Sequence, residues 1–574
     1  MITRHSFIPM AVRLAVACLV LALGGQAALA DYKSDMGYTA LAAELGAAMP
    51  TGADVPVSQV EAPLVSGAYC PDDVTDSELI GKNYTWENGY AGVSGHATTV
   101  ARYYYGSTLS FAPGISTINV YNANSFLTAL KAGKLSDPAF ETSSVQSDSW
   151  IGSYVDPVNP TSAQITKDIQ TLRRFDYTIQ RDDFVGVVAV NNGSATAIPS
   201  LLASSYNSIT VGMSNGNHSH GLTSLQQQDG SGRIKPEIVG STDGILESGN
   251  PAPYVSFVVP LVSGAAAELL QVAAGNSSLS LASHSQTVKA ILLAGATKTQ
   301  FPTWSRTPTA PLDTTYGAGQ LNVYNNYHIL TAGRQQASSS ATVGSAGWDF
   351  NTTSASQTQT YFFDVPGTTA FKEFSVVLTW NRVLTPDSFF GMTQLNSSLA
   401  NLDLKLYNAS GFALGALVDS SVNTTDNIEH IYGSLLPGRY ALEVSSSYAA
   451  STDYALAWRN RPTLPGDANL DGEVGPEDFG LLKDNFGVVR TDWAHGDFSG
   501  DGEVGPEDFG ILKDNFGASL PGLAPFAPLV GGSDAPVGLT VTPEPASLLL
   551  LLGLSAPAWW RKRRAPARGA ARGQ

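Results

Sequence analysis

Apolar and polar residues follow two different patterns along this 574-residue chain. In the first half, continuous apolar runs such as SITVGM at 208–213 alternate with Ala-rich segments such as VSGAAAELL at 262–270. Continuous apolar runs predict strands that are buried on both faces, and the Ala-rich segments predict helices that pack against them. We therefore expect an α/β domain over residues 50–335, with a parallel sheet and helices on both faces.

The second pattern begins near residue 338, where short segments alternate apolar and polar residues with a period of two. These segments include TQTYFFDV (358–365), EFSVVLTW (373–380), NLDLKLYN (401–408) and RYALEVSS (439–446). Period-two alternation between Gly, Pro and Asn turns predicts antiparallel strands. We expect an antiparallel β-sandwich over residues 338–460.

An internal repeat follows the predicted sandwich. DGEVGPEDFGLLKDNFG at 471–487 returns at 501–517 with one difference, and each copy is an acidic loop followed by a helical segment. Calcium gathers six to eight oxygen ligands, which such a loop supplies from alternate positions. We expect a small α-helical calcium-loop module over residues 463–518, with calcium as a structural cofactor. The predicted ligands are Asp467, Asn469, Asp471, Glu473 (carbonyl group) and Asp478 in the first loop, and Asp497, Ser499, Asp501, Glu503 (carbonyl group) and Asp508 in the second.

The two ends of the chain carry targeting signals. Residues 1–30 combine Arg4 and Arg13, an apolar core and an Ala-Leu-Ala cleavage site, which predicts a secretory signal peptide. Residues 519–541 form a linker rich in Pro, Gly and Ala. Residues 542–574 hold a Pro-Glu-Pro triplet, a short apolar stretch and an Arg-rich end, which predicts a transient C-terminal membrane segment.

The net charge of the chain limits the classes of binding partner that we expect. The chain carries a formal net charge of −17, and the part between the predicted signal peptide and residue 544 holds 24 basic and 49 acidic residues. An acidic surface of this kind repels nucleic acid and attracts divalent cations, so we expect no nucleic-acid partner. Cys70 is the single cysteine outside the predicted signal peptide, which excludes an intrachain disulfide in the mature chain.

Candidate chemistry lies in two segments of the predicted α/β domain. Ser256 stands at the start of the helical segment YVSFVVPLVSGAAAELL, residues 254–270, and backbone N–H groups at a helix N-terminus stabilise negative charge. His96 enters a second predicted helix in GHATTVA, residues 95–101. Taken singly, such a serine is more often a helix cap and such a histidine is more often structural.

Taken together, the motifs resemble those of the subtilisin-like serine peptidases, in the family's order. The family's histidine and serine motifs are HGTHVAG and GTSMAAPHVAG, and HATTVA and VSFVVPLVSG keep the histidine, the serine, the proline and the last glycine. GVVAVNNGS at 186–194 and KPEIVG at 235–240 are similar to the family's AAGN strand and KPDIVAPG element. The resemblance implies that Ser256 is the nucleophile, His96 the general base and acid, and Asn192 a donor to the oxyanion.

The third catalytic group departs from the family pattern. The family ends its first strand with Asp, whereas VPVSQVEAP at 55–63 places Glu61 there. A carboxylate in this position accepts the histidine Nδ1–H and offsets the imidazolium charge, and a glutamate can do both. The alternative acids are Asp54, Asp72, Asp73 and Asp76, none of which ends an apolar strand.

Three further segments resemble known modules. The predicted sandwich resembles the jelly-roll-like domain appended to many secreted subtilisin-like peptidases. The repeat pair resembles a type I dockerin, which implies a cohesin-like scaffold as partner and an association with polysaccharide catabolism. Residues 542–574 resemble a PEP-CTERM sorting signal, which implies exosortase processing, a Gram-negative-type envelope and delivery to the outer surface.

Two functions follow from these observations. The first is a secreted serine endopeptidase, sorted to the cell surface, that hydrolyses a polypeptide substrate through an acyl-enzyme. Asp148-Ser149-Trp150 is then the predicted edge strand that binds substrate. The alternative is a catalytically inactive protein of subtilisin fold that acts as a surface adhesin or scaffold and assembles through its dockerin-like module. Tyr254 and Val255 favour this alternative, because they replace the Gly and Thr that precede the family's serine.

Overall fold

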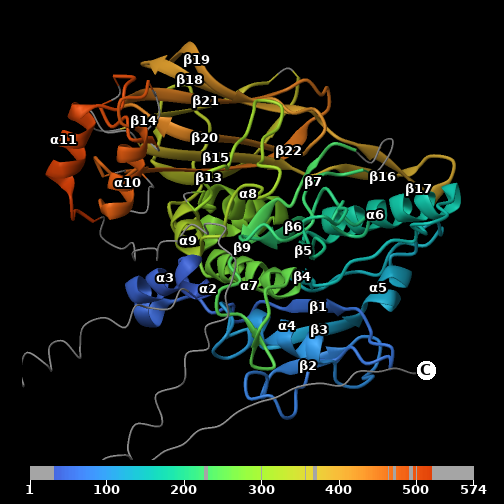
Figure 1. Ribbon diagram of the computed structural model, residues 1–574. Helices are drawn as coiled ribbons and strands as arrows, with labels where there is room; N and C mark the ends of the chain where they lie inside the picture. The colour runs from blue at the N-terminus through green and yellow to red at the C-terminus, as the bar shows by residue number, and fades with distance from the viewer. Residues whose placement is uncertain are drawn as a thin grey trace, which may run out of the picture. The chain divides into compact units, whose positions relative to one another are not determined.

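The computed structural model describes residues 31–519, apart from residues 225–230, 299, 356, 366–371, 463, 469–472, 490–494 and 500. The predicted signal peptide, the predicted sorting signal and nearly all of the predicted linker lie outside the described residues, so these assignments stay predictions. Figure 1 shows the arrangement of the helices and strands. The described residues form an α/β region, two further sheets with a hairpin, and a pair of helices at the C-terminal side.

A seven-stranded sheet forms the centre of the α/β region, and every neighbouring pair of its strands is parallel. The order is β2-β3-β1-β4-β5-β6-β9. β5 and β6 are buried along their whole length, as their continuous apolar runs predict. The predicted parallel α/β sheet is thus confirmed. The strands are β1 (Val57–Glu61), β2 (Asn83–Trp86), β3 (Thr117–Asn122), β4 (Val145–Asp148), β5 (Val185–Ala189), β6 (Ile209–Met213) and β9 (Ile238–Gly240).

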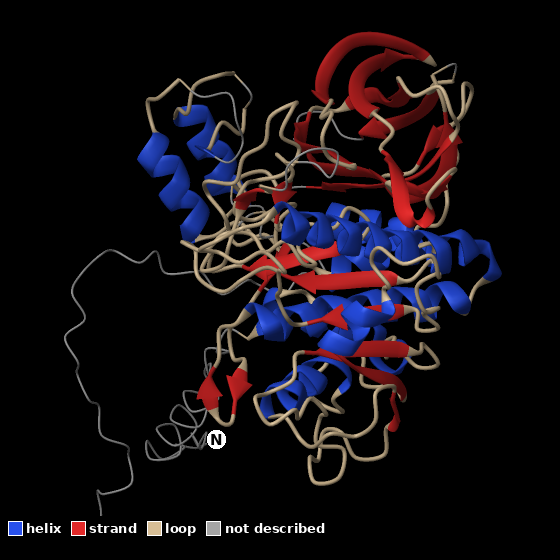
Figure 2. Cartoon of the chain, turned by 90° about the vertical axis from the view of Figure 1, so that its right-hand side faces the viewer, coloured by secondary structure: helices blue, strands red, loops and turns tan. Residues whose placement is uncertain are grey.

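Helices lie on both faces of this sheet (Figure 2). Successive side chains of a strand point to opposite faces of the sheet, so both faces of β5 are apolar and need a cover. Val187 packs in the core with the helices of one face, whereas Val188 packs with Phe175 and Ile179 on the other face. One helix, Val255–Ala274, is long and apolar enough to cross a membrane, but most of it is buried in this core. The first face carries α4 (Gly95–Tyr105), α7 (Val255–Ala274) and α8 (Ser285–Gly295), and the second carries α5 (Ala123–Ala129) and α6 (Ser162–Asp182).

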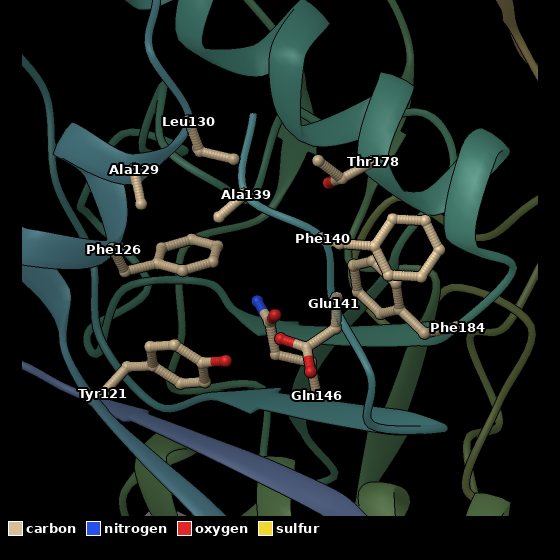
Figure 3. Close-up of a pocket in the computed structure, with 10 residues that line it drawn as sticks. All are labelled: Tyr121, Phe126, Ala129, Leu130, Ala139, Phe140, Glu141, Gln146, Thr178 and Phe184. Carbon is tan, nitrogen blue, oxygen red and sulfur yellow. The ribbon is translucent and has the colours of Figure 1, made fainter. Parts of the chain in front are cut away.

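A cavity of about 30 Å³ lies on the second face, among residues of β3, β4, α5 and α6 (Figure 3). The rings of Tyr121, Phe126 and Phe184 line it, together with the polar side chains of Glu141 and Gln146. A cavity of this size has room for about two water molecules. The lining is mostly apolar, and Gln146 is the residue of β4 that borders this cavity.

The segment before β1 folds onto the α/β core, which the sequence pattern does not predict. Tyr32, Met36 and Leu41 are buried there, and the Tyr32 hydroxyl donates to the carbonyl oxygen of Leu109 at 2.6 Å. This segment forms α2 (Tyr32–Asp35), α3 (Tyr38–Leu45) and the 3₁₀ helix η1 (Gly46–Ala48). The other short elements of the α/β region are β7 (Gly221–Leu222), β8 (Ile234–Lys235), β10 (Leu246–Glu247), β11 (Asn250–Pro251), η3 (Ser277–Ser283) and α9 (Val323–Thr331).

Two sheets follow, as the period-two pattern predicts, in the orders β12-β14-β21-β18-β19 and β13-β22-β15-β20. Their strand pairs are antiparallel, as expected, except that the two-residue strand β12 runs parallel to β14. The pattern also predicts no strand at β13, β19 or the separate hairpin of β16 and β17. The strands are β12 (Thr342–Val343), β13 (Ala346–Thr353), β14 (Gln359–Val365), β15 (Lys372–Trp380), β16 (Val383–Asp387), β17 (Gly391–Ser398), β18 (Leu402–Ser410), β19 (Ala413–Ser421), β20 (Ile428–Leu435), β21 (Gly438–Ser446) and β22 (Thr452–Pro462).

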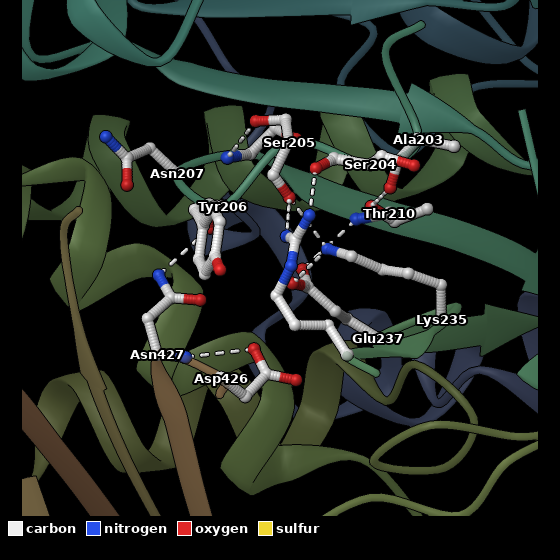
Figure 4. A network of polar contacts seen from close by, with 12 residues as sticks. Ala203, Ser204, Ser205, Tyr206, Asn207, Thr210, Lys235, Glu237, Asp426 and Asn427 are labelled. Atoms are coloured by element: carbon white, nitrogen blue, oxygen red, sulfur yellow. Dashed lines mark hydrogen bonds and ion pairs between the residues drawn. The ribbon is translucent and has the colours of Figure 1, made fainter. Parts of the chain in front are cut away.

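Buried charged groups join the α/β region to these sheets (Figure 4). Lys235 Nζ and Lys289 Nζ lie 2.6 Å and 3.0 Å from the same oxygen, Glu237 Oε1. Asp176 of α6 forms an ion pair with Arg382, which follows β15. We call this set the interface network: Asp176, Arg233, Lys235, Glu237 and Lys289 from the α/β region, and Arg382, Asp426 and Asn427 from the segments between β15 and β20.

Two helices, α10 (Pro476–Asn485) and α11 (Pro506–Asn515), follow the acidic loops of the repeat. Each begins with proline, whose missing N–H is not needed at the first helical position. Asp478 and Asp508 each accept a backbone N–H from the glycine three residues earlier, at 2.7 Å. Val474, Leu482, Val504 and Leu512 form a small apolar core between the two copies.

Candidate active site

The structure brings the four candidate catalytic residues to one edge of the parallel sheet. Glu61 is the last residue of β1, and Asn192 follows the end of β5 by three residues. His96 and Ser256 are the second residues of α4 and α7. Sites form at the carboxyl edge of an open parallel sheet because loops and helix N-termini meet there.

Glu61 and His96 form a direct pair. Glu61 Oε2 lies 2.9 Å from His96 Nδ1, and the side chain of Glu61 is 1% exposed whereas that of His96 is 35% exposed. Gln59 Nε2 donates to the other oxygen, Glu61 Oε1, at 2.8 Å and to the carbonyl oxygen of Ala97 at 3.0 Å. The Tyr105 hydroxyl in turn donates to Gln59 Oε1 at 2.6 Å. Glu61 Oε1 is therefore held in place from the protein interior, which leaves Oε2 to bind His96.

This pair sets the protonation of the imidazole. A carboxylate accepts only, so Nδ1 of His96 carries the hydrogen and Nε2 keeps its lone pair in the neutral ring. Burial lowers the pKa of His96, but the charge of Glu61, its hydrogen bond and the charge of Glu247 together raise that pKa above its ordinary value. The ring is thus arranged to take up a proton at Nε2 and to hold it.

Ser256 occupies the first turn of α7, where backbone N–H groups have no partner within the helix. Its hydroxyl lies 3.5 Å from the carbonyl oxygen of Ser149, and the Ser149 hydroxyl donates to the carbonyl oxygen of Ser256 at 2.9 Å. His96 lies on the same side of α7, with its ring centroid 5.7 Å from that of Phe257. Among the described residues, the Ser256 hydroxyl has its contact with Ser149, and proton transfer requires this hydroxyl to come within hydrogen-bond reach of His96 Nε2.

Asn192 is fixed beside this helix start. Its Oδ1 accepts the backbone N–H of Val255 at 2.9 Å, which assigns the orientation of the amide. The Nδ2 group consequently remains as a donor near the start of α7, where Ser256 carries its own backbone N–H. Two donors side by side at a helix N-terminus can stabilise an oxyanion formed on a substrate carbonyl group.

Two of the other acids considered from the sequence, Asp72 and Asp76, have other partners. Asp76 accepts from Arg102 Nε at 2.7 Å, and Asp72 accepts the backbone N–H groups of Val74 and Thr75. Asp54 lies in a turn with a φ of 62°, outside β1. Among the acids weighed, Glu61 is the one bonded to His96.

Tyr254 and Val255 differ in how far their side chains are buried. Val255 is buried and holds Asn192 through its N–H, so the larger side chain is accommodated in the core. Tyr254 is 45% exposed, with its ring centroid 6.0 Å from that of Phe257. Tyr254 is therefore the replacement that adds bulk at the solvent side of the nucleophile.

Sequence reasoning missed the residues behind Glu61. Gln59 and Tyr105 are buried and bind each other, and neither matches a motif. One signal was present: VSQVE holds three polar residues within a strand that is buried along its whole length. Polar groups in such a place need partners, which marks them as structural supports of a site.

The second acidic loop of the repeat brings three carboxylate groups close together. Asp497, Asp501 and Asp508 each offer a carboxylate oxygen, and these three atoms lie within 4.8 Å of one another. Ser499 Oγ lies 3.4 Å from Asp497 Oδ1. Three carboxylates so close repel one another, and a divalent cation would offset that repulsion. Hard oxygen ligands fit calcium, with the carbonyl group of Glu503 as a further predicted ligand.

The first acidic loop is described only in part. Asp467 and Asp478 are buried, and Asp478 Oδ1 accepts the backbone N–H of Ala468 at 2.8 Å. The predicted ligands Asn469 and Asp471 lie outside the described residues. A site with calcium ligands from this loop, Glu473 included, therefore stays a prediction.

Comparisons with known proteins give distant likenesses only. No protein-family model matches the chain, and no curated protein matches it. A protease from Pseudoalteromonas arctica PAMC 21717 is 16% identical, over 49% of this chain and 91% of its own, with a TM-score of 0.30. The MycP3 protease from the type VII (ESX-3) secretion system is 14% identical, over 52% of this chain and 89% of its own, with a TM-score of 0.33. Both neighbours are proteases, but at these scores the likeness carries no weight for the activity of this chain.

Proposed function

We propose that the chain is a secreted serine endopeptidase that hydrolyses polypeptides through an acyl-enzyme. The observation that carries the proposal is the 2.9 Å pair between His96 Nδ1 and a Glu61 carboxylate buried behind it. That pair stands beside the helix start that bears Ser256. The roles proposed are nucleophile for Ser256, general base and acid for His96, and orienting carboxylate for Glu61.

In the acylation step, Ser256 Oγ attacks the carbonyl carbon of the scissile bond and gives its proton to His96 Nε2. The carbonyl oxygen becomes an oxyanion next to Asn192 Nδ2 and the Ser256 N–H, and Glu61 offsets the charge on the imidazolium. His96 then passes the proton to the leaving amine as the carbon–nitrogen bond breaks. A positioned base contributes about 10²–10⁴-fold in rate, and an oxyanion donor about 10²–10³-fold.

In the second step, water takes the place of the amine. His96 Nε2 accepts a proton from water as the water oxygen attacks the acyl carbon. The ester bond to Ser256 Oγ breaks, and the proton returns from His96 to that oxygen. The product acid leaves, and the residues are restored for another cycle.

The proposal extends to location and partners. The signal peptide at 1–30 and the sorting signal at 542–574 motivate secretion, exosortase processing and delivery to the outer surface. The acidic loops motivate two structural calcium ions, and the dockerin-like repeat motivates a cohesin-like scaffold as partner.

A second function is favoured by two observations. The Ser256 hydroxyl is directed to Ser149 rather than to His96, and Tyr254 adds bulk where the family has glycine. Under this alternative, the chain is a catalytically inactive surface adhesin or scaffold protein that keeps the fold and assembles through the dockerin-like module.

A fluorophosphonate probe separates the two functions, because it labels only a serine activated by its surroundings. We expect labelling of the secreted chain, loss of labelling in Ser256→Ala, and hydrolysis of casein with the same dependence. Ser263→Ala is the matched control, since Ser263 is buried in the same helix and donates to the carbonyl oxygen of Val259 at 2.9 Å. Absence of labelling and of caseinolysis across the pH range would favour the inactive protein.

A further inference from the structure

Asp148 is a buried carboxyl group at the end of the central strand β4. It pairs in register with Val60 of β1 on one side and with Val188 of β5 on the other, one residue below the level of Glu61. It is fully buried. An apolar residue would fill such a place at lower desolvation cost, so a carboxyl group here needs a reason.

Two side chains on its own strand and the adjoining loop bind this carboxyl group. Trp150 Nε1 donates to Asp148 Oδ1 at 3.0 Å, and Gln146 Nε2 donates to Asp148 Oδ2 at 2.8 Å. Trp150 is itself buried in the core beneath α6, with Phe175 and Leu201. Asp148 therefore ties the indole of Trp150 to the end of β4.

The residues tied down in this way adjoin the nucleophile. Ser149 exchanges contacts with Ser256, through its hydroxyl at 2.9 Å and its carbonyl group at 3.5 Å. Gly152 forms two backbone hydrogen bonds with Leu201, each of 3.0 Å. The segment 149–152 thus has three anchors, at Ser149, Trp150 and Gly152.

Protonation of Asp148 does not have to break its hydrogen bond with Trp150. Burial raises the pKa of Asp148 to about 7, the hydrogen bonds from Gln146 and Trp150 oppose that rise, and Glu141 and Glu61 add to it. The titratable groups that face it are Glu61 of β1, Glu141 of the segment before β4, and Tyr104 of α4. Both protonation states are consequently within reach near neutral pH.

Gln146 can form a hydrogen bond with both the ionised and the protonated form of Asp148. Among the described residues, Gln146 Oε1 is buried and has no hydrogen-bond partner, and the side chain borders the cavity of about 30 Å³ (Figure 3). When Asp148 is ionised, Gln146 donates through Nε2. When Asp148 is protonated, a half-turn of the amide lets Gln146 Oε1 accept the new O–H. The other oxygen of Asp148 accepts from Trp150 in both states.

We propose that Asp148 is a positioning residue of this peptidase, which fixes Trp150 and the segment 149–152 beside Ser256 with Gln146 as its adaptable partner. This inference rests on the proposed function and deepens it. A substrate chain that pairs with the segment 149–152 meets a preformed edge, so the effect of Asp148 falls on KM more than on kcat.

The first test is kinetic. We expect Asp148→Leu to lower kcat/KM for a peptide substrate on the order of 10²-fold, mostly through KM, because the indole loses its acceptor. Asp148→Asn should stay close to the unmutated enzyme, since its carbonyl oxygen accepts from Trp150 and its amide donates to Gln146 Oε1. Trp150→Phe removes the donor together with part of the ring system and should raise KM in the same direction, which keeps the test valid where Asp148→Leu fails to fold.

Asp349→Leu is the matched control. Asp349 is an equally buried carboxylate that accepts from Arg334 Nε and from the Tyr361 hydroxyl, both at 2.8 Å, in the sheets after the α/β region. Its loss should lower stability and leave KM unchanged. A folded Asp148→Leu with normal KM and kcat would overturn the proposal, as would an Asp148→Asn that is as impaired as Asp148→Leu.

The second test needs no activity. In ¹⁵N-labelled protein, the Trp150 indole N–H resonance, assigned through Trp150→Phe, should shift with a midpoint near pH 7 and should not shift in Asp148→Asn. An indole resonance that does not move in the unmutated chain would overturn the proposed bond. If no peptide is hydrolysed at all, the proposed function fails, but this titration still decides whether Asp148 holds Trp150.

Discussion

The edge of the parallel sheet that carries the candidate active site and the interface network both contain polar and charged residues. The two regions differ in how much of the bonding capacity of these residues is already used. At the edge, His96 is 35% exposed, and its Nε2 has no hydrogen bond among the described residues. In the interface network, Lys235 and Glu237 are fully buried and bind each other at 2.6 Å. A polar group acts on a substrate only where some of its bonding capacity remains free.

The comparison also separates two uses of a carboxylate. Glu61 is bonded from behind and presents one oxygen to the His96 ring, which would change its protonation state in the proposed mechanism. Glu237 accepts two ammonium groups and Asp176 accepts Arg382, so these carboxylates fix how elements pack. Removing one member of the first kind should change rate, and removing one of the second kind should change stability.

The largest expected effect is on rate. Ser256→Ala should lower kcat on the order of 10⁶-fold, because the nucleophile of a serine triad acts as a unit with its base. Its effect on the free energy of unfolding should be small, since the hydroxyl makes one contact of 3.5 Å. Turnover of a chromogenic peptide and urea unfolding of the same sample measure the two quantities. A large stability loss would contradict the separation drawn between the two regions.

Glu61→Gln should lower kcat on the order of 10⁴-fold. The new carbonyl oxygen still accepts from Gln59, so the new amide nitrogen faces His96 Nδ1 and favours the tautomer with hydrogen on Nε2. That tautomer cannot take the Ser256 proton. Glu61→Asp keeps the charge and should lose less. Full activity in Glu61→Gln would mean that another carboxylate orients His96.

Arg382→Met should act on stability instead, at about 3–5 kcal/mol, because it leaves Asp176 without its cation in a buried site. The pKa of Asp176 also depends on Arg382. Burial raises this pKa, but Arg382 and hydrogen bonds from Ser205, Asn207 and Tyr206 bring it below its ordinary value. The stabilisation by this ion pair is therefore fully present above the pKa that the Asp176 carboxyl group has in the unfolded chain. It is lost as pH falls from there through the lower pKa of the folded chain.

Urea unfolding measures the loss, and the double variant Asp176→Asn with Arg382→Met is the control. It should recover part of the stability, since the amide brings no unpaired charge into the site. A single variant as stable as the parent chain would show that the interface network does not hold the two regions together.

The sequence predicts the α/β region for a physical reason, and it indicates the candidate site through motifs that resemble those of subtilisin-like peptidases. Apolar runs report burial directly, and Glu61, His96 and Ser256 stand at the ends of elements whose periods are visible. Pairing between distant side chains has no period. Asp176 and Arg382 are 206 residues apart, and Gln59 and Tyr105 are 46 apart. The interface network and the support behind Glu61 were therefore missed.

Calcium removal should have a smaller effect than loss of Arg382. A ligand that binds only the folded state stabilises it by about 2.7 kcal/mol at about 100 times its Kd. We expect chelation to lower the melting temperature of α10 and α11, and isothermal titration of the secreted chain to show two sites. Asp501→Asn should remove one of them, whereas Asp514→Asn, on the exposed side of α11, should remove none. Absence of heat on calcium addition would contradict the dockerin-like assignment.

The smallest expected effect concerns Glu247, whose charge adds to the pull of Glu61 on the pKa of His96. The raised pKa means that peptidase activity, which needs neutral His96, should fall as pH drops through a value above 6.5. The sign for stability is the reverse: the pair stabilises the fold most when His96 is charged, and this contribution fades as pH rises through the same value. Glu247→Gln should lower the midpoint of the kcat/KM profile, because it removes one of the charges that raise the pKa of His96. Glu443→Gln, in β21, is the matched control and should leave the midpoint unchanged. Equal midpoints in all three proteins would show that Glu61 alone sets the pKa of His96, which would sharpen the contrast between a site tuned by one buried carboxylate and an interface built from many.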